Sequence, residues 1–428
     1  MSQGLARISV HSWRDVRRLR TSPPGATRGR HGAVGASVST DTGRADVVYL
    51  DYNATAPLRP EALEAMLEAL GSVGNASSVH MAGRDAASRV DLARQRLARL
   101  LGCTPGELIF TSGATEANNL ALRAGYSSGE ILATTAVEHP AILEVARAIT
   151  AEGAGTLVEL PADRDGAVEL APLEAACHQG KVAIVSAILA NNETGVLTDL
   201  GPIIKLAHEA GALVHSDATQ YVGRLPLDLN ELDVDLLSLS GHKFGGPQGV
   251  GALFVRRGVS LLHRPLLIGG GQERGWRAGT LNVPGIAGLG AAAEAARVRL
   301  HDEAARIVGL RHVLEDGLTS RLPDCRINGA RAARLPGVTS VTFPGVPADA
   351  VLAAMPEIAA SDGSACASGA PSPSHVLVAM GLSRQDADST LRFSLGYATT
   401  ENDIERTIAA TTRAVIEVRT AMATTAEP

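Results

Sequence analysis

Short apolar runs alternate with helical patterns along most of this 428-residue chain, and this alternation limits its possible folds more than any other feature. The runs lie near residues 107–111, 130–134, 181–190, 212–217 and 233–239. Strands separated by helices return to one sheet through right-handed crossovers and run mainly parallel. Continuous apolar character indicates strands that are buried on both faces. The sequence therefore predicts an α/β fold with a mainly parallel sheet between layers of helices.

Helical patterns surround these runs. A helix is expected over residues 60–70, and a second amphipathic helix should end near Leu101, because Gly102 is a favourable stop. A long alanine-rich helix over residues 284–318 precedes shorter mixed elements. These later elements predict a second, smaller α+β domain after the sheet.

Four segments follow from this pattern: a basic N-terminal extension at 1–46, a first part of the small domain at 47–64, a large domain at 65–299, and the rest of the small domain at 300–428. The extension holds eight arginines against three aspartates. A targeting peptide, a disordered tail and a stretch before an unused upstream start codon all have this composition. We favour the untargeted disordered tail, because the Gly, Ala and Arg bias continues into the folded part.

Composition excludes several classes of function. With 45% hydrophobic and 20% charged residues, the chain is expected to be globular, and its net charge of -6 favours neither nucleic acid nor a membrane surface as a partner. No apolar run is long enough to span a bilayer. The four cysteines form no CxxC pair, and no secretory signal precedes them, so a cytoplasmic location is expected.

The stretch 234–243 is the strongest single indication of a site. Its apolar run ends abruptly in Ser-Gly-His-Lys, so Lys243 should lie beyond the carboxyl end of a buried strand, where ligands bind in such sheets. Partial burial lowers the pKa of an amine, which suits it to form a Schiff base. A lysine whose ammonium simply reaches water is the alternative.

A glycine turn at 109–119 joins an expected strand to a helix. The hydroxyls of Ser112 and Thr115 and the first backbone N–H groups of that helix would face an anion such as phosphate. The nucleotide-binding patterns GxGxxG and Gly-Lys-Ser/Thr are absent from this stretch. A helix cap without a ligand is the alternative.

Three further strand ends carry polar side chains. His139 would stack on a flat ring and move protons, although a lone histidine is more often structural. Asn191 and Asn192 would orient a substrate, although Asn-Asn is also common in turns. Asp217 at the end of a buried strand needs a cation, which a protonated pyridine nitrogen would supply, although an aspartate that caps a helix is common too. Together with Lys243, these are the parts that hold pyridoxal 5'-phosphate (PLP).

Eight motifs in this order resemble the cysteine desulfurases of the class V aminotransferase superfamily. The motifs are Tyr-Leu-Asp-Tyr-Asn-Ala-Thr at 49–55, Thr-Ser-Gly-Ala-Thr-Glu at 111–116, Glu-His at 138–139, Asn-Asn-Glu-Thr-Gly at 191–195, Asp-Ala-Thr-Gln at 217–220, Ser-Gly-His-Lys at 240–243, Gly-Gly-Gly-Gln-Glu-Arg-Gly at 269–275 and Gly-Ser-Ala-Cys at 363–366. The resemblance runs from about Tyr49 to Gly396. It implies a fold-type I PLP-dependent transferase with a seven-stranded, mainly parallel sheet.

The resemblance also implies roles for single residues. Lys243 would hold PLP covalently, His139 would stack on its ring, Asp217 would pair with its nitrogen, and Gln220 would bind its hydroxyl. The residues implied at the phosphate are Ala114, Thr115, Ser240, His242 and, in the neighbouring subunit of a homodimer, Thr280. Asn192 and Arg392 would bind the substrate L-cysteine.

Cys366 decides the chemistry that the resemblance implies. It lies among Gly, Ser and Ala, which is typical of a mobile, exposed loop with a reactive thiol, whereas Cys103, Cys177 and Cys325 have ordinary structural surroundings. The resemblance implies that Cys366 receives sulfur as a persulfide and passes it to an iron–sulfur scaffold or another acceptor protein. No resident metal is implied, and Cys366 would ligate an iron–sulfur cluster only transiently during transfer.

The sequence departs from the family at a few positions. Val137 replaces a hydroxyl residue, Trp276 is bulky within a glycine-rich turn, and Pro371 begins an unusual Pro-Ser-Pro-Ser-His stretch. The short segment after the last expected helix favours the nitrogen-fixation-like branch. A selenocysteine lyase and a non-catalytic sulfur-carrier or scaffold subunit are the competing hypotheses.

Overall fold

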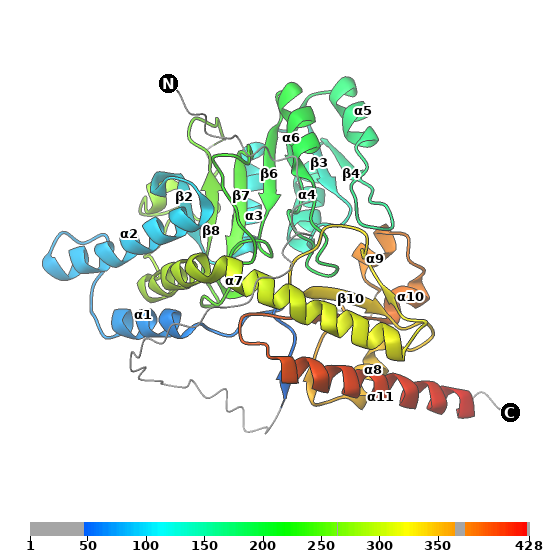
Figure 1. Cartoon of the computed structure of the whole chain (residues 1–428). Helices are drawn as coiled ribbons and strands as arrows, with labels where there is room; N and C mark the ends of the chain where they lie inside the picture. The colour runs from blue at the N-terminus through cyan, green and yellow to red at the C-terminus, as the bar shows by residue number, and fades with distance from the viewer. Residues whose placement is uncertain (1–46, 263, 364–372, 426–428) are drawn as a thin grey trace, which may run out of the picture. The chain divides into compact units, whose positions relative to one another are not determined.

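The computed structural model describes residues 47–262, 264–363 and 373–425, and a sheet of seven strands forms its centre (Figure 1). The strands are β2 (Leu108–Thr111), β3 (Ile131–Thr135), β4 (Thr156–Leu160), β5 (Val182–Ser186), β6 (Leu213–Asp217), β7 (Leu236–Ser240) and β8 (Gly251–Val255). Their order across the sheet is β2-β8-β7-β6-β5-β3-β4. β8 runs antiparallel to β2 and β7, and the other neighbouring pairs are parallel. The predicted fold, with a mainly parallel sheet of seven strands, is confirmed.

Helices cover both faces of this sheet. α3 (Ala114–Gly125) and α4 (Pro140–Glu152) pack against one face, in an apolar cluster with alternate residues of the strands. The other face packs against α2 (Met81–Leu101), α6 (Leu200–Glu209) and the first half of α7 (Val283–Arg321), and α5 (Ala171–Gln179) lies over β4. Side chains on both faces of the strands are therefore buried, as their continuous apolar character predicted.

The register of the central strands brings polar residues to one edge. Ser186 of β5 lies beside His215 of β6, and Asp217 lies beside Ser238 of β7. β5, β6 and β7 are mutually parallel, so their carboxyl ends share this edge. A 3-10 turn, η3 (Gly241–Lys243), follows β7 directly and places Lys243 there.

A second group of elements follows the central sheet. β9 (Arg326–Ile327), β10 (Val338–Thr342) and β12 (Thr390–Ser394) form an antiparallel sheet in the order β12-β10-β9, and β1 (Val48–Tyr49) pairs with β11 (Ile358–Ala359). α8 (Ala348–Ala354), α11 (Glu401–Thr425) and the second half of α7 share one apolar core with these strands. α9 (His375–Ala379) and α10 (Arg384–Asp388) precede β12.

The expected helices match the observed ones closely. α1 spans Pro60–Leu70, α2 ends at Leu101, and Gly102 adopts a left-handed backbone with φ of 65°, which glycine accommodates without strain. The long helix α7 extends a few residues beyond the expected range of 284–318. Within the described ranges, no helix combines the length and apolar character needed to cross a membrane. The N-terminal extension lies outside these ranges, and the division into domains stays a prediction.

Candidate active site

A cavity of about 1020 Å³ opens at the carboxyl edge of the central sheet. The predicted site residues that line it are Ala114, Thr115, His139, Asn192, Asp217, Gln220, Ser240, His242 and Lys243. They come from separate stretches of chain, which the parallel strands bring to one edge. Arg392 and Thr280 lie outside this lining, and Cys366 lies outside the described residues.

The turn between β2 and α3 forms an anion cradle at one end of the cavity. Gly113 has a φ of 155°, and a Cβ on the adjacent Gly251 would lie 2.7 Å from the Cα of Gly113. Gly113 is therefore favoured by its backbone conformation, and Gly251 by the close approach of neighbouring backbone. The first N–H groups of α3, at Ala114 and Thr115, line the cavity, where the helix dipole favours a negative charge.

Asp217 is buried at the end of β6 and is held by two donors. The side-chain amide of Asn118, in α3, donates to one carboxylate oxygen at 2.8 Å, and the backbone N–H of Thr219 donates to the other at 2.9 Å. These two bonds fix the orientation of the carboxylate. Asn118 was not singled out from the sequence. Its only signal was an amide one helical turn after Ala114.

His139 caps the start of α4 and is neutral at physiological pH. Its Nδ1 accepts a hydrogen bond from the backbone N–H of Ala141 at 3.0 Å, so the proton belongs on Nε2. Burial lowers its pKa below the ordinary 6.5, and the nearby charge of Asp217 opposes this in part. A neutral ring can stack on an aromatic ligand and can accept or donate a proton.

Glu138 is a fully buried carboxyl beside this histidine, and sequence reasoning gave it no role. It accepts hydrogen bonds from the hydroxyl of Thr135 and the backbone N–H of Ile188. Burial raises its pKa well above 4.5, and the charge of Asp217 raises it further. Both effects favour the neutral form of the Glu138 carboxyl.

Lys243 donates two hydrogen bonds from Nζ to backbone carbonyls, at 2.6 Å to Asn53 and at 2.9 Å to Ala54. Asn53 contacts several predicted site residues, a role that the sequence did not indicate. Its carbonyl also accepts from the amide of Gln220 at 3.0 Å, and its own amide donates to the carbonyl of Asn192 at 2.8 Å. The segment after β1 thus lies beside Lys243 and connects it to Gln220 and Asn192.

Ser240 and His242 flank the lysine turn. Ser240 is buried, and a Cβ on Gly113 would lie 3.6 Å from its hydroxyl oxygen, so this hydroxyl faces the anion cradle. His242 Nδ1 lies 3.1 Å from the hydroxyl of Thr55. Burial lowers the pKa of His242 to about 4, with a further contribution from Lys243. His242 therefore offers a neutral hydrogen-bond donor to a phosphate and not a positive charge.

Four buried polar atoms around the cavity have no hydrogen-bond partner among the described residues. They are Oδ1 of Asn118, Oδ1 of Asn192, Oγ1 of Thr219 and Oε1 of Gln220. An unsatisfied buried polar group costs about 1–3 kcal/mol, so this concentration at one cavity indicates a polar ligand. PLP fits the donor set, because the carboxylate of Asp217 suits its ring nitrogen, the amide of Gln220 its hydroxyl, and the start of α3 its phosphate.

Arg392, in β12, is buried next to the cavity. Its guanidinium donates to a carboxylate oxygen of Asp51 at 2.7 Å and to the carbonyl of Asn192 at 3.0 Å. Its Nε has no partner among the described residues. The structure therefore links Arg392 to the cavity through Asn192, while Asp51 partly neutralises its charge.

Glu193 lies between the two ends of the segment 364–372, which carries Cys366. The hydroxyl of Ser374 donates to Oε2 of Glu193, and a Cβ on Gly363 would lie 3.3 Å from the same oxygen. Burial raises the pKa of Glu193 above 4.5. Glu193 thus contacts both flanks of the Cys366 segment. Its place in the motif at 191–195, directly after Asn192, did not indicate this role.

Thr280 is exposed and follows a strained turn. Glu273 and Arg274 adopt left-handed backbones with φ of 46° and 58°, which costs non-glycine residues energy. The carboxylate of Glu273 holds this turn in place through Arg94, and Arg277 binds Glu116 of α3 at 3.0 Å. The segment that presents Thr280 is therefore fixed against the anion cradle of its own chain.

Val137 and Trp276, the two departures from the family pattern that lie among the described residues, do not line the cavity. Val137 is buried in a small apolar cluster with Ile188 and Val376, and Trp276 packs beside the cluster under α3 and α4. Pro371 lies outside the described residues.

The three described cysteines carry unreactive thiols. Cys103, Cys177 and Cys325 form no disulfide. Burial raises the pKa of all three, to about 12 for Cys103. Since the thiolate is the nucleophilic form, these residues are protonated and inert at neutral pH.

The chain is similar to known proteins over most of its length. The model of the family described as aminotransferase class-V matches residues 48–407. A cysteine desulfurase of Trichormus azollae is 44% identical over 368 residues, which cover 85% of this chain and 91% of that protein. The cysteine desulfurase IscS of Anaeromyxobacter dehalogenans is 42% identical over 367 residues, covering 84% and 90%.

Solved structures show the same fold. A NifS-like protein from Rickettsia africae superposes with a TM-score of 0.78 at 34% identity, covering 87% of this chain and all of that one. The structure of SspA in complex with cysteine gives a TM-score of 0.71 at 32% identity, covering 81% and 98%. On the family match and these relatives, the chain belongs to the aminotransferase class-V family.

Proposed function

We propose that the protein is a PLP-dependent cysteine desulfurase, which converts L-cysteine to L-alanine and transfers the sulfur to Cys366 as a persulfide. The observation that carries this proposal is the cavity at the sheet edge, where Lys243, Asp217 and His139 converge beside unsatisfied buried polar atoms. The activity named for relatives at 42–44% identity supports it. Bound PLP would supply an electron sink for negative charge at the substrate Cα.

The side chains of this chain have separate tasks in the proposal. Lys243 binds the cofactor through Nζ and moves the proton at the substrate Cα. Asp217, oriented by the side-chain amide of Asn118, pairs with the ring nitrogen. The neutral His139 stacks on the ring and carries a proton on Nε2.

Arg392 and Asn192 orient the substrate. The forked guanidinium of Arg392 suits a carboxylate, and it is held in place by Asp51 and by the carbonyl of Asn192. The unpaired Oδ1 of Asn192 is available to a substrate donor.

Sulfur transfer requires no external oxidant. The thiolate of Cys366 attacks the substrate sulfur, a sulfur–sulfur bond forms, and the carbon–sulfur bond breaks. The carbon fragment keeps the bonding electron pair and takes up a proton, which yields alanine. An acceptor thiolate then attacks the outer sulfur of the persulfide, the sulfur–sulfur bond breaks, and Cys366 is released as the thiolate. The acceptor that we propose is an iron–sulfur scaffold or another sulfur-acceptor protein, and we propose that the protein acts in the cytoplasm.

We also propose a homodimer in which Thr280 binds the phosphate in the partner's site. Two exposed apolar segments support it, at 67–81 and at 266–268, where Val79 and Ile268 are 86% and 90% exposed. Large exposed apolar side chains in groups are typical of interfaces between subunits. Thr280 is exposed, lies outside its own cavity, and belongs to a segment that two ion pairs hold in place.

The direct test is the reaction of the purified protein with L-cysteine and a reductant. We expect sulfide and alanine in equal amounts, and loss of about 100-fold or more of this activity in Cys366→Ser. The variant should retain the yellow colour of the bound cofactor. Cys103→Ser is the matched control and should react like the wild type.

Full sulfide release by Cys366→Ser would contradict the persulfide step. Faster alanine release from selenocysteine than from cysteine would instead indicate a selenocysteine lyase. Colour and PLP binding without either activity would indicate a non-catalytic subunit.

A further inference from the structure

A carboxylate lies in the anion cradle, where the proposed phosphate would bind. Glu116, in the first turn of α3, lines the cavity at the sheet edge together with Ala114 and Thr115, and its side chain is only 13% exposed. Among the described residues that line this cavity, Asp217 is the other carboxylate, and it suits the ring nitrogen. A negative charge beside a phosphate weakens phosphate binding, so the position of Glu116 requires an explanation.

Glu116 shapes the cradle through the backbone. Its Oε2 accepts a hydrogen bond from the backbone N–H of Ser112 at 2.8 Å, so the side chain reaches back across the start of the helix, as a glutamate at the third helical position often does. Burial alone would raise the pKa of Glu116, but the hydrogen bonds from Ser112 and Arg277 outweigh it and hold this pKa below 4.5. Glu116 is therefore ionised at neutral pH.

Arg277 supplies the positive charge that balances Glu116. Its Nε donates to Oε1 of Glu116 at 3.0 Å, and the Arg277 side chain is 21% exposed. Both partners are thus largely shielded from water, where an ion pair interacts more strongly than on an open surface. Arg277 is not part of the cavity lining, so it would act on a bound anion through Glu116.

The turn before Arg277 holds this arginine in place. Glu273 and Arg274 have left-handed backbones, which cost non-glycine residues energy. The carboxylate of Glu273 offsets this cost, because it binds Arg94 and accepts from the backbone N–H of Phe110 at 2.8 Å. Phe110 belongs to β2, which leads into the cradle. The turn and the cradle are therefore joined at two places, through Glu273 and through Arg277.

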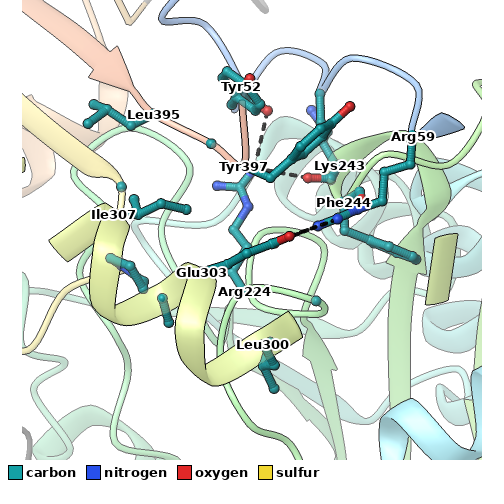
Figure 2. A pocket seen from close by; sticks show the side chains of 16 residues that line it. Tyr52, Arg59, Arg224, Lys243, Phe244, Leu300, Glu303, Ile307, Leu395 and Tyr397 are labelled. Atoms are coloured by element: carbon teal, nitrogen blue, oxygen red, sulfur yellow. Dashed lines mark hydrogen bonds and ion pairs between the residues drawn. The ribbon is translucent and has the colours of Figure 1, made fainter. Parts of the chain in front are cut away.

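Another shielded arginine–glutamate pair shows how Glu116 differs. Arg59 binds Glu303 at 2.7 Å beside a second cavity of about 460 Å³, which Figure 2 shows. Neither of these two residues lines the cavity at the sheet edge. Glu116 is thus both paired with an arginine and exposed to whatever binds in the anion cradle.

We propose that Arg277 is a positioning residue that neutralises Glu116 and so allows the anion cradle to bind the phosphate of PLP. Without Arg277, the carboxylate of Glu116 would repel this phosphate. The inference rests on the proposed function, because it concerns the cofactor of that reaction. The alternative role of the ion pair is only to fasten the segment that presents Thr280.

Titration of the full-length protein, freed of PLP, with either PLP or pyridoxal tests this role, because pyridoxal has the same ring and aldehyde but no phosphate. We expect Arg277→Met to bind PLP about tenfold more weakly and pyridoxal as tightly as the wild type does. The absorbance of the bound cofactor measures both dissociation constants. Arg277→Lys keeps the charge and should bind PLP within about twofold of the wild type.

Two further variants separate neutralisation from fastening, because both lack the ion pair. In the double variant Glu116→Gln/Arg277→Met no carboxylate remains to be balanced, so the affinity for PLP should return close to that of the wild type. Glu116→Gln alone leaves Arg277 unbalanced and should bind PLP about threefold more tightly.

Arg334→Met is the matched control. Arg334 binds Glu315 at 2.7 Å, both side chains are well shielded, and neither lines the cavity at the sheet edge. Its replacement should leave the affinities for PLP and pyridoxal unchanged.

Equal PLP affinities in the wild type and in Arg277→Met would overturn the inference, and so would equal losses of PLP and pyridoxal affinity in that variant. A double variant as weak as Arg277→Met would also overturn it, because the pair would then only fasten the Thr280 segment. If Arg277→Met did not fold, Glu116→Gln would decide, since PLP binding no tighter than in the wild type would contradict neutralisation. If the wild type bound no PLP, the proposed function itself would fail, which is a distinct outcome.

Discussion

His215 lies in β6, two residues before Asp217, and shows how the sheet supports the site with a neutral polar network. Its Nδ1 lies 2.9 Å from the hydroxyl of Ser186 in β5, and its Nε2 lies 2.9 Å from the hydroxyl of Ser238 in β7. Both ring nitrogens are satisfied, so the ring links three adjacent strands. Burial lowers the pKa of His215 to about 4, against the opposing charge of Asp217.

This histidine should make the protein less stable in acid. An unfolded histidine takes up a proton near pH 6.5, whereas folded His215 stays neutral until about pH 4. Protons therefore favour the unfolded chain as the pH falls from 6.5 to 4. We expect His215 alone to cost about 2 kcal/mol of unfolding free energy between pH 7.5 and pH 5.

Urea denaturation at the two pH values measures this effect. The variant His215→Gln should lose correspondingly less stability on acidification than the wild type. The exposed His301 supplies the control, because His301→Gln should behave like the wild type. An unchanged pH dependence in His215→Gln would show that the ring is not held neutral by the fold.

Single residues also show what the sequence did not reveal. Asn53, Asn118 and Arg224 contact predicted site residues, and Glu138 and Glu193 directly precede and follow such residues in the chain, yet none of the five was assigned a role in advance. Each contacts a partner that lies between 50 and 190 residues away in the sequence. Such contacts depend on tertiary packing, which has no local sequence signal.

At the scale of elements, Glu193 joins the segment after β5 to the flanks of the Cys366 segment. It accepts a hydrogen bond from Ser374, the residue that caps α9, and lies against Gly363 on the other flank. A residue that fixes both ends of a short segment limits where its middle can reach. We therefore expect Glu193 to position Cys366 for attack on the substrate sulfur.

In Glu193→Ala we expect PLP binding to persist and persulfide formation on Cys366 to slow by about tenfold or more, because misplacement of a reacting group is costly. Single-turnover mixing with L-cysteine, followed by mass spectrometry of the Cys366 peptide, measures this rate. Glu193→Gln keeps an acceptor for Ser374 and should be impaired less. Glu144→Ala, on the exposed face of α4, is the control.

If persulfide formed on Cys366 of Glu193→Ala at the same rate as in the wild type, Glu193 would not position Cys366. If Glu193→Ala lost PLP binding together with persulfide formation, Glu193 would instead belong to the cofactor site.

The central strands and long helices were predictable because their periodicity is strong and local. β4 and β8 were not anticipated. β4 is partly exposed at the edge of the sheet and has no continuous apolar run, and β8 lies within a glycine-rich stretch. The expected strand over 182–190 ends at Ser186 as β5, although Ala187 and Leu189 still bond to the backbone of β6. The positions of the phosphate cradle, Asp217 and Lys243 were predictable because parallel strands end at a common edge.

At the scale of the whole molecule, the proposed dimer explains two features that a single chain leaves unexplained. The first is the exposure of Val79 and Ile268, and the second is the strained, doubly anchored turn that presents Thr280. An interface over these segments would bury the apolar side chains and carry Thr280 to the partner's phosphate site.

Charged substitutions test this arrangement. Val79→Asp and Ile268→Asp should shift the protein toward the monomer in sedimentation velocity and weaken PLP binding, because each site would lose the partner's Thr280. Val313→Asp, which changes a half-exposed valine of α7, should leave the assembly unchanged. A wild-type protein that is monomeric at micromolar concentration would contradict the shared site.

A covalent bond between PLP and Lys243 is the central feature of the proposed active site. Borohydride reduction of the PLP-loaded protein, followed by peptide mass spectrometry, tests this bond directly. We predict that the reduced cofactor is recovered on the peptide that contains Lys243 and that Lys243→Ala yields no such label. Recovery of the label on another lysine, or no label on a protein that has bound PLP, would contradict the assignment of the active site.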